Sequence, residues 1–211
     1  MFNKSIIIAP HRYNPHELWV TLGVLKKYKV PFTVLSTYSV IFDEVTCEAV
    51  KVRTVTPQEL WLEGDPAIIF ISGNTPDTIS YWENPVIQQL VTAAMKRGLL
   101  LAGICMSVPI LHQAVRGKKV SVFPLKRALA FLEERGAIIS PVSITLDTYT
   151  LDTPNLITAE NESVTQTWIE TIVDIMKGNI PKLNLVSAPA GMFNFVRERK
   201  PVLIIERIKR G

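Results

Sequence analysis

The stretch that decides the fold is LLLAGICMSVPILHQA, residues 99–114. Its first six residues form an apolar run, which is typical of a buried parallel strand. Gly103, Cys105 and Ser107 then form a G-x-C-x-S pattern, and a helix is expected to begin within two or three residues of the cysteine. Small residues on both sides of a nucleophile are needed where a strand turns sharply into a helix. The pattern therefore predicts a nucleophile elbow at Cys105.

A cysteine in this position would lie at the N-terminus of a helix. The positive end of the helix dipole and the unpaired backbone N–H groups there favour the thiolate over the thiol. We therefore expect the pKa of Cys105 to fall from about 8.5 into a range of roughly 4–7. The alternative interpretation is a structural cysteine buried in an apolar segment.

Strands and helices alternate on both sides of this stretch. The segments expected to be helices are 15–28, 85–97, 125–135 and 164–177, the last with capping-box spacing of Ser163 and Gln166. The segments expected to be strands are 4–9, 32–36, 67–72, 99–104, 119–123, 138–140, 143–147 and 155–158, with an exposed antiparallel ribbon over 45–55. This order predicts an α/β fold with a mainly parallel sheet covered on both faces. Ligands of such sheets bind beyond the carboxyl ends of the strands.

The composition is that of an ordinary folded chain. Of 211 residues, 47% are apolar and 20% charged, which argues against disorder, collagen and coiled coil. Two distant cysteines form no disulfide framework, so we expect a reducing, cytoplasmic location. The apolar runs are too short to span a membrane. Three scattered histidines and two cysteines suggest no metal ligand set, and no phosphate-binding glycine motif is present, so we expect no cofactor.

Two further loops follow expected strands at their carboxyl ends. The loop at 72–76 reads SGNTP, and the backbone N–H groups of Ser72 and Gly73 could form an oxyanion hole together with the N–H of Met106. The alternative is a simple Gly-Asn turn into a helix.

The first loop, residues 11–17, reads HRYNPHE. Asn14 and Pro15 have the order of a helix cap, so Glu17 is either a capping acid or a carboxyl group that reaches the elbow. His11 and His16 are either auxiliary bases or exposed loop histidines.

Three segments carry a resemblance to a known family. They are KSIIIAPHRYNPHELWVTLGVLKKYKVPFTVLS (4–36), AIIFISGNTPDT (67–78) and KRGLLLAGICMSVPILHQAVRGKKVSVFP (96–124), followed in order by GAIIS and NLITAENESVTQTW. In order and spacing they resemble the ThiJ/PfpI family of the class I glutamine amidotransferase-like superfamily. The resemblance implies a flavodoxin-like three-layer α/β/α sandwich that forms dimers or higher oligomers. It covers nearly all of residues 4–177.

The resemblance also assigns roles to the site residues. It implies that Cys105 is the elbow cysteine, that Glu17 is its partner, and that Gly73 and Met106 occupy the backbone positions of the anion pocket. Ser72 stands where the family often has glycine. Met106 replaces the histidine that follows the cysteine in family proteases, and Phe123 replaces the histidine of deglycase-like members. No histidine occurs after His112, so the His-x-Glu pair of glutamine amidotransferases is absent.

Three functions follow from these matches and departures. The first is a cysteine-dependent hydrolase or lyase that acts on small electrophiles such as reactive dicarbonyls, glyoxalase-like or deglycase-like, without a histidine triad. The second is a stress protein that senses oxidants through reversible oxidation of Cys105. The third is a non-catalytic ligand-binding module. Peptidase or amidotransferase activity is disfavoured, because a nucleophilic cysteine needs a positioned base for peptide hydrolysis.

The net positive charge of the chain is concentrated in its C-terminal residues. Residues 178–211 carry seven basic and two acidic side chains, a net charge of +5, which leaves −1 for residues 1–177. We therefore divide the chain into a ThiJ/PfpI-like domain, 1–178, and a basic extension rich in β-structure, 179–211. Two expected strands, 183–187 and 202–208, would add an edge ribbon, pack on a neighbouring subunit or cover the cysteine pocket. No nucleic-acid-binding motif is present, so we expect no nucleic-acid partner.

Overall fold

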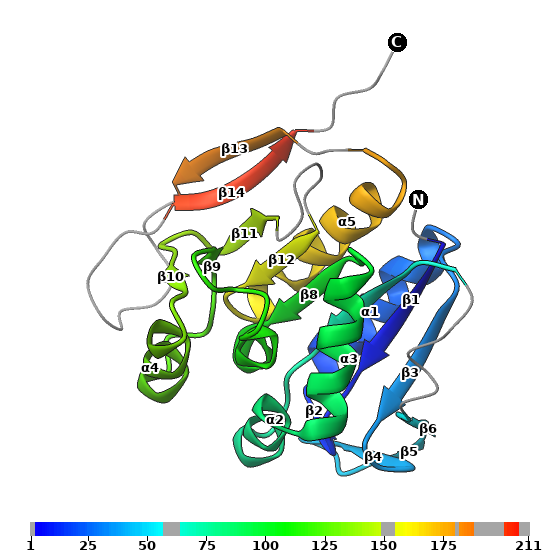
Figure 1. Cartoon of the computed structure of the whole chain (residues 1–211). Helices are drawn as coiled ribbons and strands as arrows, with labels where there is room; N and C mark the ends of the chain where they lie inside the picture. Colours follow the sequence, from blue (N-terminus) through cyan, green and yellow to red (C-terminus); the bar gives the residue numbers. More distant parts are fainter. Residues whose placement is uncertain (1–2, 57–63, 149–154, 180–181, 188–200, 207–211) are drawn as a thin grey trace.

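The computed structural model describes residues 3–56, 64–148, 155–179, 182–187 and 201–206 (Figure 1). A seven-stranded sheet forms its centre, in the order β11-β12-β8-β7-β1-β3-β6. The strands are β1 Lys4–Ile8, β3 Phe32–Ser36, β6 Arg53–Thr54, β7 Pro66–Phe70, β8 Leu101–Ile104, β11 Ile144–Asp147 and β12 Leu156–Ala159. All neighbouring strands pair parallel except β11 and β12, which pair antiparallel. The predicted mainly parallel sheet is confirmed.

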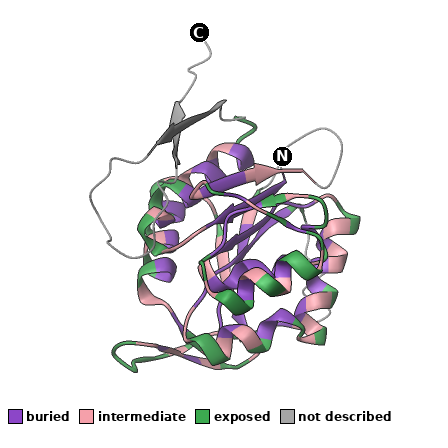
Figure 2. Ribbon diagram, turned by 90° about the vertical axis from the view of Figure 1, so that its left-hand side faces the viewer, coloured by how far each residue is buried: buried purple, intermediate pink, exposed green. Residues whose placement is uncertain are grey.

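Helices cover both faces of this sheet. They are α1 Pro15–Lys27 and α5 Thr165–Met176 on one face, and α2 Thr75–Trp82, α3 Pro85–Lys96 and α4 Lys126–Glu134 on the other. The alternation along β1 shows why: Ile6 and Ile8 pack with the α2–α4 face, whereas Ile7 and Ala9 pack with α1 and α5. Figure 2 shows the strands buried between helices whose outer faces are exposed. The predicted three-layer sandwich is confirmed.

The beginning of α1 forms as its sequence predicts. Asn14 is the N-cap, its side-chain Oδ1 accepts from the Glu17 N–H at 3.1 Å, and Pro15 follows in the first turn. The cap uses only the backbone of Glu17, so its carboxyl group points elsewhere. The Asn14 N–H, which the carboxyl group of a capping acid would bind, donates instead to the Ser72 carbonyl, so the capping-acid alternative is wrong.

Three local expectations need correction. The segment after Cys105 is a seven-residue 3₁₀ helix, η2 Cys105–Leu111, and not a regular α-helix. The 45–55 ribbon is divided: β5 (Ala49–Lys51) pairs antiparallel with β4 (Val40–Asp43), whereas β6 joins the central sheet. Ser163 caps nothing, because a short 3₁₀ turn, η3 Glu162–Val164, precedes α5.

The smaller strands form three further sheets. β2 (Arg12–Tyr13) pairs with β4, and β9 (Lys119–Val120) pairs with β10 (Ile138–Ile139). In the C-terminal extension, β13 (Lys182–Ser187) and β14 (Pro201–Glu206) pair antiparallel as a two-stranded sheet of their own. Both strands of the extension are thus where the sequence placed them, but in the described residues they do not extend the central sheet. Among the described residues, no helix combines the length and apolar character that a membrane crossing requires.

Candidate functional site

The chain turns sharply at Cys105, between β8 and η2. Its φ angle is 57°, in the left-handed region that residues other than glycine rarely adopt. Such a conformation costs about 1–2 kcal/mol and is typical of functional sites. The residue is partly exposed. The sharp strand-to-helix turn that the sequence predicted is present.

Gly103 and Ser107, the small residues on either side of the cysteine, have different structural roles. A Cβ atom on Gly103 would lie 3.1 Å from Leu111 Cδ1 and 3.3 Å from Val108 Cα, so β8 and η2 approach too closely for a larger residue. The buried Ser107 hydroxyl accepts from the Ile104 N–H at 2.9 Å and lies 2.7 Å from the Phe70 carbonyl oxygen, to which it donates. Ser107 therefore joins the turn to the neighbouring strand β7.

Replacing Ser107 by alanine is expected to lower the free energy of unfolding by about 1–3 kcal/mol. The Ile104 N–H would stay buried without its side-chain acceptor. Chemical denaturation of Ser107→Ala measures this cost. Ser80→Ala, which removes an exposed hydroxyl bonded to the Asp77 carbonyl, is the matched control and should change stability by less than about 0.5 kcal/mol. Equal effects of the two variants would contradict the role given to Ser107.

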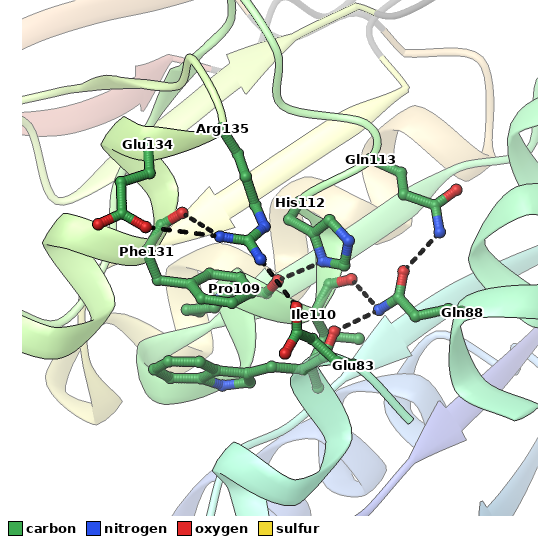
Figure 3. Close-up of polar contacts among 10 residues, drawn as sticks. Glu83, Gln88, Pro109, Ile110, His112, Gln113, Phe131, Glu134 and Arg135 are labelled. Carbon is green, nitrogen blue, oxygen red and sulfur yellow. Dashed lines mark hydrogen bonds and ion pairs between the residues drawn. The ribbon is translucent and has the colours of Figure 1, made fainter. Parts of the chain in front are cut away.

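Side chains from α2 and α3 bind the carbonyl groups of η2; Figure 3 shows Gln88 of α3. The Gln88 amide donates to the carbonyl oxygens of Trp82 and Ile110, at 2.7 and 2.9 Å. The Trp82 indole N–H donates to the Met106 carbonyl at 2.9 Å. These bonds satisfy carbonyl groups at both ends of η2 and fix the helix behind Cys105.

His112 lies in this outer cluster and not at the elbow. Its ring meets Phe131 edge to face, with 5.6 Å between ring centroids, and its Nδ1 is 3.3 Å from the Pro109 carbonyl oxygen (Figure 3). Burial lowers the pKa of His112. A groove of about 470 Å³ beside this cluster is lined by residues that include Trp82, Arg127 and Phe131. Cys105 is not among its lining residues, so the groove is separate from the site.

Glu17 is completely buried and faces the loop after β7. The Ser72 N–H donates to Glu17 Oε2 at 2.6 Å, and the Ser72 hydroxyl donates to Oε1 at 2.8 Å. Burial raises the pKa of Glu17 to about 8, although both hydrogen bonds from Ser72 act in the opposite direction. Glu17 is therefore protonated at neutral pH and loses its proton under mildly alkaline conditions.

The surroundings of Cys105 disfavour its thiolate. Burial raises the pKa of Cys105 to about 12, with a further contribution from the Glu17 carboxylate. Hydrogen bonds from the Ser72 side chain and the Met106 backbone act in the opposite direction but do not prevail. The expected fall of this pKa into the range of roughly 4–7 is therefore wrong. Seven residues of 3₁₀ helix offset too little of the burial cost and the repulsion from a buried carboxylate.

The Gly73 N–H has a different partner from the predicted one. It donates to the Thr78 hydroxyl at 3.0 Å, and the Asn74 N–H donates to the Arg12 carbonyl at 2.9 Å. A Cβ atom on Gly73 would lie 1.9 Å from that same carbonyl oxygen, so glycine is needed because two backbone segments cross there. Of the predicted oxyanion donors, the Met106 N–H is the one whose hydrogen bond acts on the cysteine.

The two histidines of the first loop lie apart from the thiol. The His11 ring packs against the Tyr38 ring at a tilt of 39°, with 4.4 Å between ring centroids, and meets Phe42 edge to face. His16 is exposed in the first turn of α1. Within the described residues, no hydrogen bond or ring contact connects either histidine with Cys105. The described residues contain no cluster of three or more side chains that could ligate a metal ion.

Sequence reasoning missed the acidic group beside the site. Glu162 follows β12 and accepts a 2.8 Å hydrogen bond from the Asn14 amide, which brings it to the loop that carries Glu17. Its charge raises the pKa of both Glu17 and Cys105, and Glu44 also acts on Glu17. Glu162 lies just beyond the carboxyl end of β12, which pairs parallel with β8, so the rule that sites lie at the carboxyl ends of parallel strands also covers it.

No protein-family model matches the chain. An uncharacterized protein of Methanocaldococcus jannaschii is 25% identical over 182 residues, which are 82% of each chain. A ThiJ/PfpI domain protein from Brachyspira murdochii superposes with a TM-score of 0.69 at 15% identity, over 84% of this chain and 98% of that one. DJ-1 from Schizosaccharomyces pombe superposes with a TM-score of 0.65 at 15% identity, over 82% of this chain and 90% of that one.

This chain has the ThiJ/PfpI fold. The resemblance seen in the sequence is confirmed at that level, and the flavodoxin-like sandwich it implied is present. In a ThiJ/PfpI fold, the loops after β1, β7 and β8 meet at one edge of the sheet. Here these loops carry Glu17, Ser72 and Cys105. A fold alone sets no activity, so the function must be argued from these three side chains.

Proposed function

We propose that the chain is a ThiJ/PfpI-family protein whose Cys105 attacks small uncharged electrophiles such as reactive dicarbonyls, with Glu17 as the proton acceptor. The observation that carries the proposal is a strained, partly exposed cysteine beside a buried carboxyl group whose pKa is near 8. An acid or base with a pKa close to the working pH is best suited to exchange protons during a reaction.

The proposed step moves one proton and forms one bond. The Cys105 sulfur attacks a carbonyl carbon, the thiol proton leaves toward the Glu17 carboxylate, and the carbonyl electron pair moves onto its oxygen. That oxygen then takes a proton from Glu17, which gives a hemithioacetal and restores the carboxylate. The Met106 N–H, which acts on the sulfur, supports the proposed role of donor to the developing oxyanion. Because the thiol is protonated at neutral pH, the reaction needs this base.

The charge around the site supports an uncharged substrate. Glu17 and Glu162 act on the thiol, Glu44 and Glu162 act on Glu17, and these repulsions are part of the pKa shifts described above. An anionic electrophile would meet this repulsion in a partly buried setting, where charges are weakly screened. Family membership further suggests a homo-oligomer and a cytoplasmic location.

The test is cysteine-dependent consumption of a simple dicarbonyl, methylglyoxal, above pH 8. We expect Cys105→Ser to lower the rate at least about 100-fold and Cys47→Ser, which removes the exposed cysteine, to leave it unchanged. Labelling read by intact mass adds the charge comparison: the ratio of iodoacetamide to iodoacetate labelling should be higher at Cys105 than at Cys47. Consumption that survives Cys105→Ser would contradict the proposal, and an equal ratio at both cysteines would contradict the choice of an uncharged substrate.

A second function is supported by the hydrogen-bond donors beside the sulfur. The Ser72 side chain and the Met106 N–H both act on Cys105, and the same donors would stabilise the oxygen atom of a reversible sulfenic group. A redox sensor built this way would gain mass at Cys105 before Cys47 under limiting peroxide. The raised pKa of the thiol slows such oxidation at neutral pH, so we place this function second.

A further inference from the structure

Asn14 makes hydrogen bonds to three separate segments of the site. Its side-chain Oδ1 accepts from the Glu17 N–H at 3.1 Å, and its backbone N–H donates to the Ser72 carbonyl oxygen at 2.9 Å. Its side-chain Nδ2 donates to Oε2 of Glu162 at 2.8 Å. The first two bonds join backbone groups and fix the start of α1 against the loop after β7. The third bond orients a charged side chain.

The order of the strands places this third bond beside the reactive cysteine. β12, which precedes Glu162, pairs parallel with β8, and Ala159 lies in register with Ile104, the residue before Cys105. The two segments therefore leave the sheet next to each other at its carboxyl edge. Strands β8 and β7 lie between β12 and β1 in the sheet. The bond from Asn14 to Glu162 thus joins loops on either side of the strands that lead to Cys105 and Ser72.

A second acid of the same loop is held in another direction. Glu160 Oε2 accepts from the Ser143 hydroxyl at 3.2 Å, and the Glu160 N–H donates to the Ser143 carbonyl at 2.8 Å. Ser143 precedes β11, the edge strand that lies on the far side of β12 from β8. One carboxyl group of this loop is therefore bound toward the edge of the sheet, and the other toward the site. Consistent with this placement, the charge of Glu162 contributes to the raised pKa of Cys105.

We propose that Asn14 is a positioning residue that holds the Glu162 carboxylate beside the elbow, and that this fixed charge makes Cys105 select uncharged electrophiles over anionic ones. Without the bond, the exposed Glu162 side chain would sample other rotamers, and its charge would act less on an approaching anion. Asparagine suits this position because its oxygen caps the helix while its nitrogen still donates. This inference rests on the proposed function, since selection needs a reacting Cys105.

The test compares two alkylating reagents at one sulfur. Iodoacetamide and iodoacetate labelling of Cys105 is measured by peptide mass in the full-length chain at pH 9 and low salt, with Cys47 in the same sample as the reference. Because both reagents attack the same thiolate, the ratio of their rates does not depend on how much thiolate is present. The ratio reports the charge around the sulfur instead.

Three variants should change this ratio differently. Glu162→Gln is expected to lower the ratio of iodoacetamide to iodoacetate labelling about 3-fold to 10-fold, and added salt should shrink this difference. Asn14→Ser keeps a capping oxygen but loses the donor to Glu162, so it should lower the ratio at least about 2-fold. Glu160→Gln is the matched control, since it removes an equal charge from the same loop, and it should leave the ratio unchanged.

The double variant Asn14→Ser/Glu162→Gln separates positioning from capping. If Asn14 acts through Glu162, the double variant should have the ratio of Glu162→Gln alone. A ratio that falls further in the double variant, or that stays at the wild-type value in Asn14→Ser, would overturn the inference. A merely structural role for Asn14 would change both labelling rates by the same factor and leave their ratio unchanged.

The outcomes also separate this inference from the proposed function. A labelled Cys105 whose ratio is the same in the wild-type chain and in Glu162→Gln would overturn the inference alone. Absence of Cys105 labelling by both reagents would overturn the proposed function, and this inference with it. Thermal unfolding shows whether each variant is folded. If Asn14→Ser is unfolded, Asn14→Thr, which also supplies a capping oxygen, serves as the second variant.

Discussion

Between pH 4.5 and about 8, the free energy of unfolding is expected to fall by on the order of 4 kcal/mol because of Glu17 alone. The pKa of this carboxyl group is raised from 4.5 to about 8 in the folded chain, so across this window the folded state holds a proton that the unfolded state has released. Stability therefore decreases as pH rises, which is the opposite of the effect of a salt-bridged carboxylate. Above pH 8, the folded chain must hold a buried charge that water would solvate better.

Glu17→Gln tests this expectation. A glutamine has the hydrogen-bond pattern of the protonated acid: its oxygen accepts from the Ser72 N–H, and its amide donates to the Ser72 hydroxyl oxygen. The variant should match the wild-type chain near pH 4.5 and exceed its stability by several kcal/mol at pH 9. Urea denaturation over a pH series measures the difference, with Glu133→Gln on the exposed face of α4 as the control. An unchanged pH slope in Glu17→Gln would show that Glu17 is not buried in its acid form.

Gly73→Ala is expected to lower the free energy of unfolding by about 3 kcal/mol or more. Its Cβ would lie 1.9 Å from the Arg12 carbonyl oxygen and 2.7 Å from Tyr13 Cα, so backbone atoms of the first loop would have to move. This movement would also disturb the neighbouring Ser72 and its bonds to Glu17. For a chain of this size, the melting temperature should fall by roughly 6–12 °C, and Cys105 labelling should change with it.

Gly23→Ala is the matched control for this substitution. Gly23 is exposed within α1, and a Cβ there meets nothing within 4 Å. Alanine should therefore stabilise the chain by about 0.5–1 kcal/mol, because it restricts the unfolded chain and favours the helix. The two substitutions are predicted to have opposite signs. A mild effect of Gly73→Ala would mean that the crossing of the two backbone segments is looser than the structure shows.

The sequence was sufficient for features set by neighbouring residues. Three features depend only on residues a few positions apart in the sequence. They are the alternation along β1, the Asn14–Pro15 start of α1 and the sharp turn with small residues around Cys105. The carboxyl-end rule then placed Glu17, Ser72 and Cys105 together at one edge of the sheet from the sequence alone. The helix after Cys105 was the local exception: it is a 3₁₀ helix, and the apolar pattern does not distinguish a 3₁₀ helix from an α-helix.

The protonation of the site was decided by the tertiary structure. A cysteine at the start of a helix predicts a thiol with a lowered pKa. In the folded chain, burial and the Glu17 carboxyl group raise the pKa of Cys105 instead. Neither effect can be inferred from the residues next to the cysteine. Likewise, Ser72 binds Glu17 across 55 positions, and Glu162 reaches Asn14 across 148. The sequence by itself determined the sheet, the helices and the turn that presents Cys105, since these depend on local periodicity and backbone conformation. Only the folded chain decided where its protons reside, since solvation and charge depend on groups that the sheet brings together.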